Sequence, residues 1–247
     1  MDEETIREPG SKGSKEYSVQ GFTGVQVSTA IEFEIMHSAD YSVKAVGDDR
    51  LIKRLKVEVS DQVLKVGLDS GVSLFGGLRS NGGLKVTITM PQLRRLAASG
   101  ACKGTAKGFS SSDDFNLELS GASQAQIDIE AGKTALEVSG AGRLSGVLKA
   151  QDTAFKLSGA SRCELSGSGG DTRLDFSGAS RADLSGFEMK DLDVDLSGAS
   201  KANIKMDGKL NAGLSGASSL EYAGNVVLGK TSTSGASKIR QAEDTPR

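Results

Sequence analysis

Three aspartates at alternate positions are the side chains of this sequence best placed to do chemistry. Asp191, Asp193 and Asp195 alternate with apolar residues, so on a β-strand all three carboxylates project from one outer face. Two carboxyl groups about 5 to 9.5 Å apart can hydrolyse a glycosidic bond when burial raises the pKa of one of them. Exposed aspartates satisfy the distance but not the desolvation. Two interpretations therefore stay open, a solvated face and a cation or substrate site.

A second motif matches a nucleotide-binding pattern by its letters. Residues 224–231 (GNVVLGKT) satisfy GxxxxGK[ST], in which backbone amides at the start of a helix cradle phosphate. The residues that follow, Ser232 to Ala236, instead continue a repeat that runs through the chain. We expect a strand and a corner there, without nucleotide binding.

The two cysteines and the single histidine do not form a recognisable metal or catalytic motif. Cys102 and Cys163 lie three repeats apart, about 14 Å at the spacing of stacked strands. A disulfide needs Cα atoms closer than about 7 Å, so both thiols should be free, and Cys163 takes an inward position. His37 is expected at the surface. We predict no catalytic residues, no metal site and no cofactor.

A repeated tetrapeptide, Ser-Gly-Ala-Ser, determines where these side chains lie, and we call it the phrase. Copies or near copies begin at Ser99, Ser120, Ser139, Ser158, Ser177, Ser197, Ser215 and Ser234, a mean step of about 19 residues. Apolar residues stand one and three positions before the first serine, and five and seven positions after it, with polar residues between them. This alternation predicts two strands per period, each with one buried face, and a looser return segment that completes the coil. Polar residues after the phrase, among them Arg162, Arg181 and Lys201, should face solvent, and a further glycine such as Gly167 or Gly186 often ends the second strand.

A fixed period near 20 residues, without helical spacing, is typical of stacked coils. Glycine suits each corner because it adopts positive φ without a Cβ clash. One coil cannot bury its own inward face, and parallel connections are nearly always right-handed. The sequence therefore predicts an all-β chain that forms a single right-handed parallel β-helix with coils of about 19 residues.

The boundaries of this solenoid follow from composition. Residues 1–15 are charged and should be a disordered tail, and residues 241–247 are polar and should fray. Residues 16–240 should form the β-helix, with less regular coils before Leu84 and a turn at residues 47–49. Residues 69–83 are rich in glycine and serine yet hold apolar residues, so they are either a flexible surface loop or a flap that covers a helix end or a partner.

Composition narrows the classes of partner. The formal net charge is −2, which gives no electrostatic case for nucleic acid or an anionic membrane. Aromatic residues make up 4% of the chain and tryptophan is absent, which weakens the case for a sugar site built on stacking rings. Nothing approaches the roughly 20 apolar residues of a transmembrane helix, and no signal peptide is evident.

The repeated L-S-G-A-S phrases, the opening FTGVQVSTAIEFEI (residues 22–35) and VTITMPQLRRL (residues 86–96) resemble the putative auto-transporter adhesin head (GIN domain) family. The resemblance covers about residues 17–240. It implies a β-helix similar in shape to pectate lyases but without their catalytic residues, exported to the envelope or surface of Gram-negative bacteria and adhesive there. The family brings no established catalytic positions to this chain.

Three hypotheses for function follow. The first is a non-enzymatic protein of the cell surface, the outer membrane or the periplasm that binds host matrix, glycan or other cell-surface components. The second is an enzyme that acts on polysaccharides through the outward face of Asp191, Asp193 and Asp195. The third is a scaffold that forms a homo-oligomer through an end or an edge.

Overall fold

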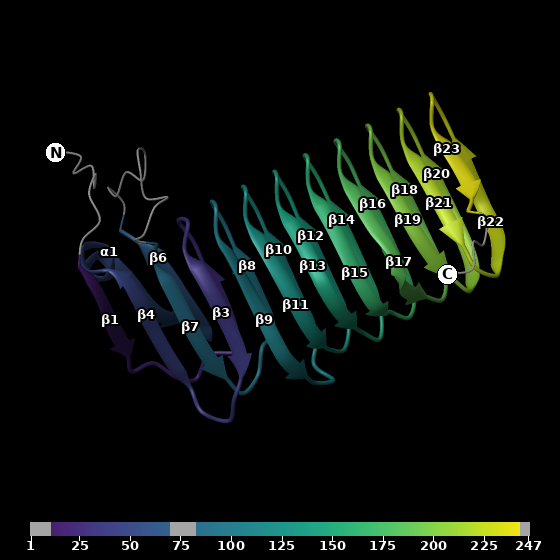
Figure 1. Ribbon diagram of the computed structural model, residues 1–247. Helices are drawn as coiled ribbons and strands as arrows, with labels where there is room; N and C mark the ends of the chain where they lie inside the picture. Colours follow the sequence, from purple (N-terminus) through teal and green to yellow (C-terminus); the bar gives the residue numbers. More distant parts are fainter. Residues whose placement is uncertain (1–10, 70–82, 243–247) are drawn as a thin grey trace.

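The computed structural model describes residues 11–69 and 83–242, and most of them belong to two β-sheets that face each other along a rod (Figure 1). We call the 12-stranded sheet the first sheet and the 11-stranded sheet the second sheet. Strands that follow one another in the chain alternate between the two sheets from β8 onward, so each coil contributes one strand to each sheet.

The first sheet contains, in spatial order, β1 (Lys12–Tyr17), β4 (Ser42–Asp48), β7 (Lys85–Met90), β3 (Glu32–His37), β9 (Lys103–Ser110), β11 (Gln124–Glu130), β13 (Arg143–Lys149), β15 (Arg162–Ser168), β17 (Arg181–Met189), β19 (Lys201–Met206), β21 (Ser219–Ala223) and β23 (Lys238–Gln241). The second sheet contains β22 (Val226–Thr233), β20 (Gly208–Leu214), β18 (Leu192–Leu196), β16 (Thr172–Phe176), β14 (Thr153–Leu157), β12 (Thr134–Val138), β10 (Phe115–Leu119), β8 (Arg95–Ala98), β2 (Gly24–Val27), β6 (Val63–Leu68) and β5 (Leu55–Ser60).

The repeated phrase forms the corner that leads from the second sheet to the first. Its eight glycines, from Gly100 to Gly235, all have φ between +68° and +82°, as the sequence predicted. They stack in a ladder, because the N–H of the alanine in one coil donates to the glycine carbonyl of the coil before. Ala179 N–H donates to Gly159 O over 2.7 Å, and Ala199 N–H to Gly178 O over the same distance.

The last serine of the phrase closes this corner from inside. Ser180, Ser200 and Ser218 are at most 1% exposed. The hydroxyl of each donates to the carbonyl of the first serine in its own phrase, over 3.0, 2.7 and 2.8 Å respectively. These bonds offset the cost of burying a hydroxyl, whereas the buried last serines of two other copies, Ser123 and Ser161, have no such partner. In the copies that end at Ser180, Ser200 and Ser218 the last serine therefore stabilises the corner through a hydrogen bond as well as through its small size.

The opposite corner, which returns from the first sheet to the second, carries a buried threonine in three successive coils. Thr134, Thr153 and Thr172 stand at the start of consecutive strands of the second sheet, and the hydroxyls of Thr153 and Thr172 lie 2.8 Å apart. We expected a looser return segment here. Instead only residues 169–171 separate β15 from β16, so the coil is tight at both corners.

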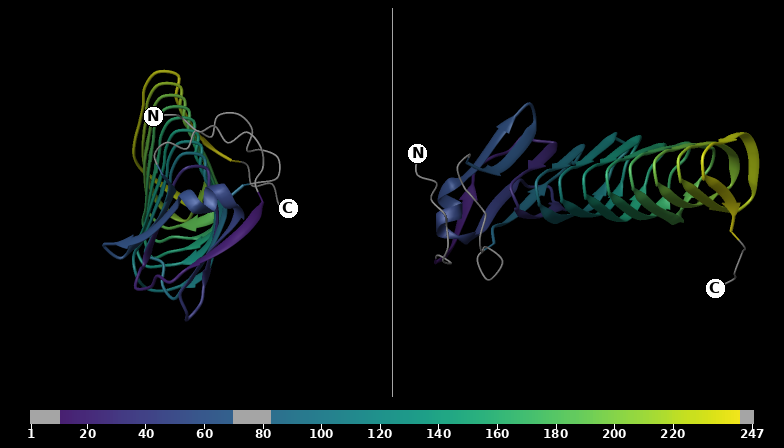
Figure 2. Two further views of the ribbon diagram at one scale, coloured as in Figure 1. Left: turned by 90° about the vertical axis from the view of Figure 1, so that its left-hand side faces the viewer. Right: turned by 90° about the horizontal axis from the view of Figure 1, so that it is seen from above.

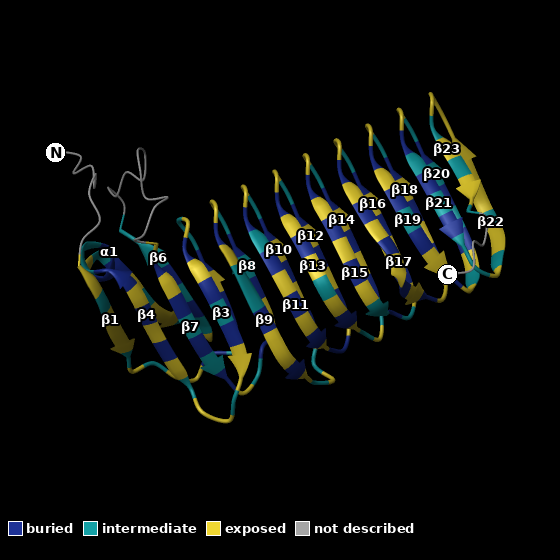
Figure 3. Ribbon diagram, in the orientation of Figure 1, coloured by how far each residue is buried: buried dark blue, intermediate teal, exposed yellow. Residues whose placement is uncertain are grey.

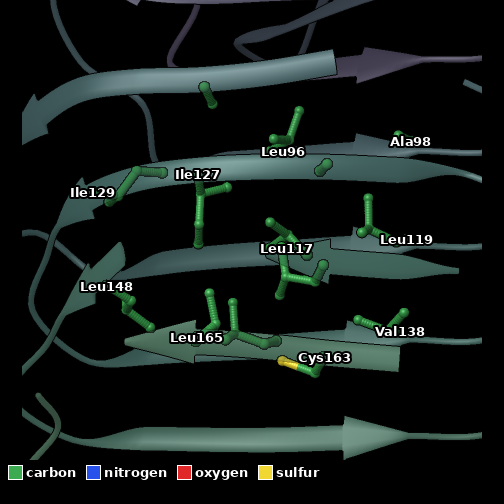
Figure 4. Close-up of a cluster of buried hydrophobic side chains, with 14 of the residues drawn as sticks. Leu96, Ala98, Leu117, Leu119, Ile127, Ile129, Val138, Leu148, Cys163 and Leu165 are labelled. Atoms are coloured by element: carbon green, nitrogen blue, oxygen red, sulfur yellow. The ribbon is translucent and has the colours of Figure 1, made fainter. Parts of the chain in front are cut away.

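The core lies between the two sheets and consists of the alternate residues that the sequence predicted to point inward. Leu117, Leu119, Leu165 and Leu174 are each at most 3% exposed, and stripes of buried and exposed positions mark the regular coils before β22 (Figure 3). Figure 4 shows how side chains from both sheets, such as Leu117 and Ile127, fill the space between them. Apolar burial from coil to coil is the main stabilising contribution.

Not every glycine lies where we expected. Gly167 and Gly186 were expected to end their strands but lie within β15 and β17. Gly167 has φ of +121°, and a Cβ there would lie 2.0 Å from the Leu148 carbonyl oxygen of the preceding coil. Glycine is required because the two backbones approach closely.

The chain before β8 forms less regular coils and a cap at their outer end, and the cap is the part that we did not predict. Strands β2 and β3 pair in parallel with β8 and β9, and β6 and β7 pair in parallel with β2 and β3. A short helix, α1 (Asp49–Arg54), covers the outer end with Leu51 and Ile52 buried (Figures 1 and 2). Strand β4 pairs antiparallel with both β1 and β7, and β5 pairs antiparallel with β6. The expected turn at residues 47–49 is wrong, because Gly47 and Asp48 end β4 and Asp49 begins the helix.

The ends of the chain are ordered further than predicted within the described residues. Strand β1 begins at Lys12, so residues 12–15 belong to the fold and not to a tail. At the other end Gln241 is part of β23. The remaining expectations for residues 1–10, 70–82 and 243–247 lie outside the described residues.

Candidate functional site

Asp193 and Asp195 project from the outer face of the second sheet, as predicted. Both are exposed on β18. Asn211 Nδ2 on the next coil donates to Asp193 Oδ1 over 2.8 Å. On the preceding coil, the Arg173 guanidinium donates to Asp195 Oδ2 over 3.1 Å. Arg173, Asp193 and Asp195 line one shallow hollow.

Asp191 does not join them. It precedes β18 and lies at the threonine corner, where its Oδ1 accepts the backbone N–H of Lys209 over 2.8 Å. It lines a different hollow together with Lys190 and Asp207. Asp191 does alternate with apolar residues, but it lies in the corner, one residue before β18 begins at Leu192. The structure therefore brings together two of the three predicted aspartates.

Ion pairs between coils cover the same outer face. Arg95 pairs with Glu118 over 3.0 Å, Lys156 with Glu137 over 3.5 Å, and Arg173 with Asp195 over 3.1 Å. Each pair joins one coil to its neighbour. The carboxylates are about half exposed or more, so water competes for them and each pair contributes at most about 1 kcal/mol. This arrangement favours the solvated face over a desolvated catalytic pair.

The thiols are free and buried, as predicted for Cys163. Burial raises the pKa of Cys163 to about 12, with a smaller contribution from Glu164. Burial also raises the pKa of Cys102, whose Sγ lies 3.2 Å from the Ser99 carbonyl oxygen. A thiol held protonated is a poor nucleophile.

The remaining sequence motifs are structural. Residues 226–231 of the GxxxxGK[ST] match lie in strand β22, which continues to Thr233, and a corner follows instead of the helix that a phosphate loop needs. His37 is exposed at the end of β3, and its ring meets the edge of Phe109 at 5.9 Å. Within residues 11–69 and 83–242, no three His, Cys, Asp or Glu side chains are grouped so as to hold a metal ion. No helix in that part is long and apolar enough to span a membrane.

The outer face of the first sheet carries a feature that our sequence analysis missed. The residue that follows each phrase begins a strand of this sheet, and successive strands pair so that these residues stand side by side. Six of these eight positions are basic and exposed, and we call them the basic row: Lys103, Arg143, Arg162, Arg181, Lys201 and Lys238. The two interruptions are Gln124 and Ser219.

A shallow hollow of about 540 Å³ opens over part of the basic row. Lys103, Arg143 and Arg162 line it, together with acidic side chains that include Glu34 and Glu164. The signal was present in the sequence, but only when the copies are aligned on their first serine and compared at the fifth residue. We had placed Arg162, Arg181 and Lys201 on an outward face without seeing that they form one line.

Residues 21–226 match the sequence pattern of a protein family described as "Putative auto-transporter adhesin, head GIN domain". This range is more than half of the chain. No protein with a curated description matches the sequence.

Several solved structures share the fold. A putative adhesin from Parabacteroides merdae superposes with a TM-score of 0.85 at 18% identity, covering 97% of this chain and 99% of that one. A putative lipid binding protein from Parabacteroides distasonis gives 0.83 at 15% identity, covering 97% and 100%. A putative adhesin from Bacteroides fragilis gives 0.73 at 17% identity, covering 96% and 100%. At these identities the likeness concerns the fold alone.

Proposed function

Since this chain belongs to the auto-transporter adhesin head (GIN domain) family, we propose that it is a non-enzymatic binding protein of the bacterial surface or envelope. Its targets would be components of host matrix, of glycans or of other cell surfaces. The observation that carries the proposal is the uninterrupted stack of coils from Leu93 to Gln241. Such a stack presents two long outer faces, one on each sheet.

The form of these faces supports binding by many weak contacts. Within the regular coils only short corners separate the strands, so no inserted loop builds a deep enclosed cleft there. The hollows on the outer faces are shallow and open. Ligands that bury most of their surface usually occupy deep apolar pockets, whereas extended partners suit extended faces.

A binding screen with the full chain tests this proposal. Labelled protein would be applied to immobilised matrix proteins, to glycan arrays that include acidic polysaccharides, and to whole cells. We expect saturable binding to at least one of these surfaces, and no such binding by a thermally unfolded sample. Absence of saturable binding to all of them would refute the proposal. Surface proteolysis of intact cells that express the protein would test the location.

An enzyme that acts on polysaccharides is the competing candidate, because Arg173, Asp193, Asp195 and Asn211 meet in one hollow. The exposure of both carboxylates and their hydrogen bonds to neighbouring coils weigh against it. Assays on acidic glycans would decide. Turnover that is lost in Asp193→Asn but kept in Asp128→Asn, an exposed aspartate of the other sheet, would establish the enzyme and overturn our proposal.

Self-association is a further possibility that one observation favours. Strands β22 and β23 are the last strands of their sheets, and Val227 and Leu228 on β22 are 67% and 52% exposed. Edge strands with apolar side chains can pair with another chain. Light scattering at high concentration tests this, since a monomer throughout would remove the homo-oligomer.

A further inference from the structure

The basic row is a continuous line of charge and not a scatter of surface cations. Arg143 lies directly beside Arg162, Arg162 beside Arg181, and Arg181 beside Lys201 in the register of the first sheet. Strands in a sheet are about 4.8 Å apart, so the eight positions from Lys103 to Lys238 extend over about 34 Å. The line therefore follows the long axis of the rod.

These cations have no partners of opposite charge within the described parts of the chain. No carboxylate oxygen there lies within 4.0 Å of Arg143, Arg162, Arg181 or Lys201. Elsewhere the fold pairs outward cations between neighbouring strands: Arg95, Lys156 and Arg173 have such partners on the second sheet, and Lys85 pairs with Glu34 and Lys205 with Glu188 on the first. The four successive cations of the basic row are left without such pairs.

Stacked like charges are unfavourable for the fold. Cations directly opposite each other on neighbouring strands destabilise a sheet, and at about 4.8 Å they lie within the screening length of about 8 Å at physiological salt. The sequence nevertheless places four in succession. Stacking like charges breaks a rule of sheet stability, and nothing in the fold offsets its cost. Such exceptions are expected at functional sites.

The acidic side chains nearby do not cancel the row. Glu32 of β3 stands beside Lys103 at the end of the row, and Glu164, Asp183 and Glu221 stand two residues further along their strands on the same face. Asp183 is engaged within its own strand, where its Oδ1 accepts from the Ser185 backbone and hydroxyl over 3.2 and 2.7 Å. On the other side of the row lie the exposed glycines and alanines of the corner, which leave it open to a partner.

We propose that the basic row binds a linear acidic polysaccharide, carboxylated or sulfated, whose chain lies along the axis of the rod. This proposal deepens the proposed function and rests on it. Each guanidinium presents a planar fork of donors that matches a carboxylate or sulfate group. The hollow over Lys103, Arg143 and Arg162 lies on the path that the polysaccharide would follow.

Charge and spacing favour this partner over others. An extended chain of pyranose rings advances per sugar by a length similar to the spacing of strands. Side chains on one face of an extended peptide repeat at about 6.6 Å, which does not match the row. Single-stranded nucleic acid and neutral glycans need exposed rings for stacking, whereas Phe109, Phe187 and Tyr222 in strands β9 to β21 of this sheet are buried.

A matched pair of triple variants of the full chain tests the proposal. The row variant carries Arg143→Gln, Arg162→Gln and Arg181→Gln. The control variant carries Arg95→Gln, Lys156→Gln and Arg173→Gln, which remove the same charge from the other sheet. Binding to heparin, to polygalacturonate and to a single-stranded oligonucleotide would be measured for both variants and the original chain between 50 and 200 mM salt.

We expect the original chain to bind heparin or polygalacturonate more tightly than the oligonucleotide. The row variant should bind the polysaccharide about tenfold more weakly at the lowest salt, because three exposed ion pairs are lost. For the row variant, the slope of log K against log salt concentration should be smaller in magnitude by up to about two, since fewer counterions are released. The control variant should stay within about twofold of the original chain.

The row variant should also be at least as stable as the original chain, because like-charge repulsion is relieved. This result would show that weaker binding does not come from unfolding. Equal losses in both variants would reduce the effect to net charge and overturn the proposal, as would stronger binding to the oligonucleotide. Absence of binding to either polysaccharide would overturn it too, while binding elsewhere in the screen would leave the proposed function standing.

Discussion

Replacing Gly178 by alanine tests the glycine ladder that joins the coils. Gly178 has φ of +73°, a region that costs an L-residue about 1–2 kcal/mol. A Cβ there would lie 2.6 Å from the Gly159 carbonyl oxygen. Moving that carbonyl away weakens its hydrogen bond from Ala179 N–H, worth about 0.5–1.5 kcal/mol. The alanine also restricts the unfolded chain, which offsets roughly 0.4–1 kcal/mol, so we expect Gly178→Ala to lower the free energy of unfolding by about 1–3 kcal/mol.

Gly21 provides the matched control. Its φ is +77°, but a Cβ there meets no atom within 4 Å, so Gly21→Ala keeps the backbone strain without the clash. We expect a loss of about 1 kcal/mol, because the alanine also restricts the unfolded chain. Urea unfolding followed by far-UV circular dichroism would compare the midpoints at equal m-value. If both variants lost the same free energy, the close contact between successive glycines would be refuted.

Three further predictions concern the core. Leu174 is fully buried, so Leu174→Ala should cost about 2–5 kcal/mol in urea unfolding, and an unchanged midpoint would contradict the inward assignment. Ser200→Ala should cost about 1 kcal/mol because the hydroxyl bonds the Ser197 carbonyl, whereas Ser161→Ala should be neutral or stabilising because the buried Ser161 hydroxyl has no partner. The thiol of Cys163 should resist alkylation in the folded protein, and stability should fall as pH rises from about 9 to about 12, since only the unfolded thiol ionises there; Cys163→Ala should flatten this part of the pH profile.

The regular coils could be predicted from sequence because every signal in them is local and repeated. Each copy of the phrase sets a corner, and alternation on both sides of it identifies the buried residues. Phe155 and Phe176 are buried as predicted, while Glu137 and Asp175 between inward positions are exposed. An irregular copy of the phrase can be interpreted by aligning it with the regular copies, since all coils must stack in one register.

The N-terminal cap could not be predicted in the same way. Helix α1 has six residues, too few for an apolar period, and its start depends on the Asp48 carboxylate, which accepts the Arg50 N–H over 2.9 Å. Strand β1 is polar and becomes a strand because β4 offers it a free edge. Antiparallel pairing at this end is set by tertiary contacts, which override weak local preference.

For the candidate site too, local sequence patterns could be interpreted, whereas contacts between coils could not. Alternation placed Asp193 and Asp195 correctly, but it also included Asp191, which the corner separates from them. The basic row required the register between strands, which a single coil does not contain. Arg162 alone is an ordinary exposed residue, and it acquires meaning only because Arg143 and Arg181 stand on either side of it.

The most direct test of the account removes one whole coil. Deleting residues 139–157 joins Val138 to Ser158, which restores the order of strand, phrase and strand, and brings Thr134 to the position of Thr153 beside Thr172. Urea unfolding of this variant should show a folded protein that is moderately less stable, with an m-value lower in proportion to the residues removed. A variant that is unfolded, or that keeps its secondary structure without a cooperative transition, would contradict a stack of equivalent coils.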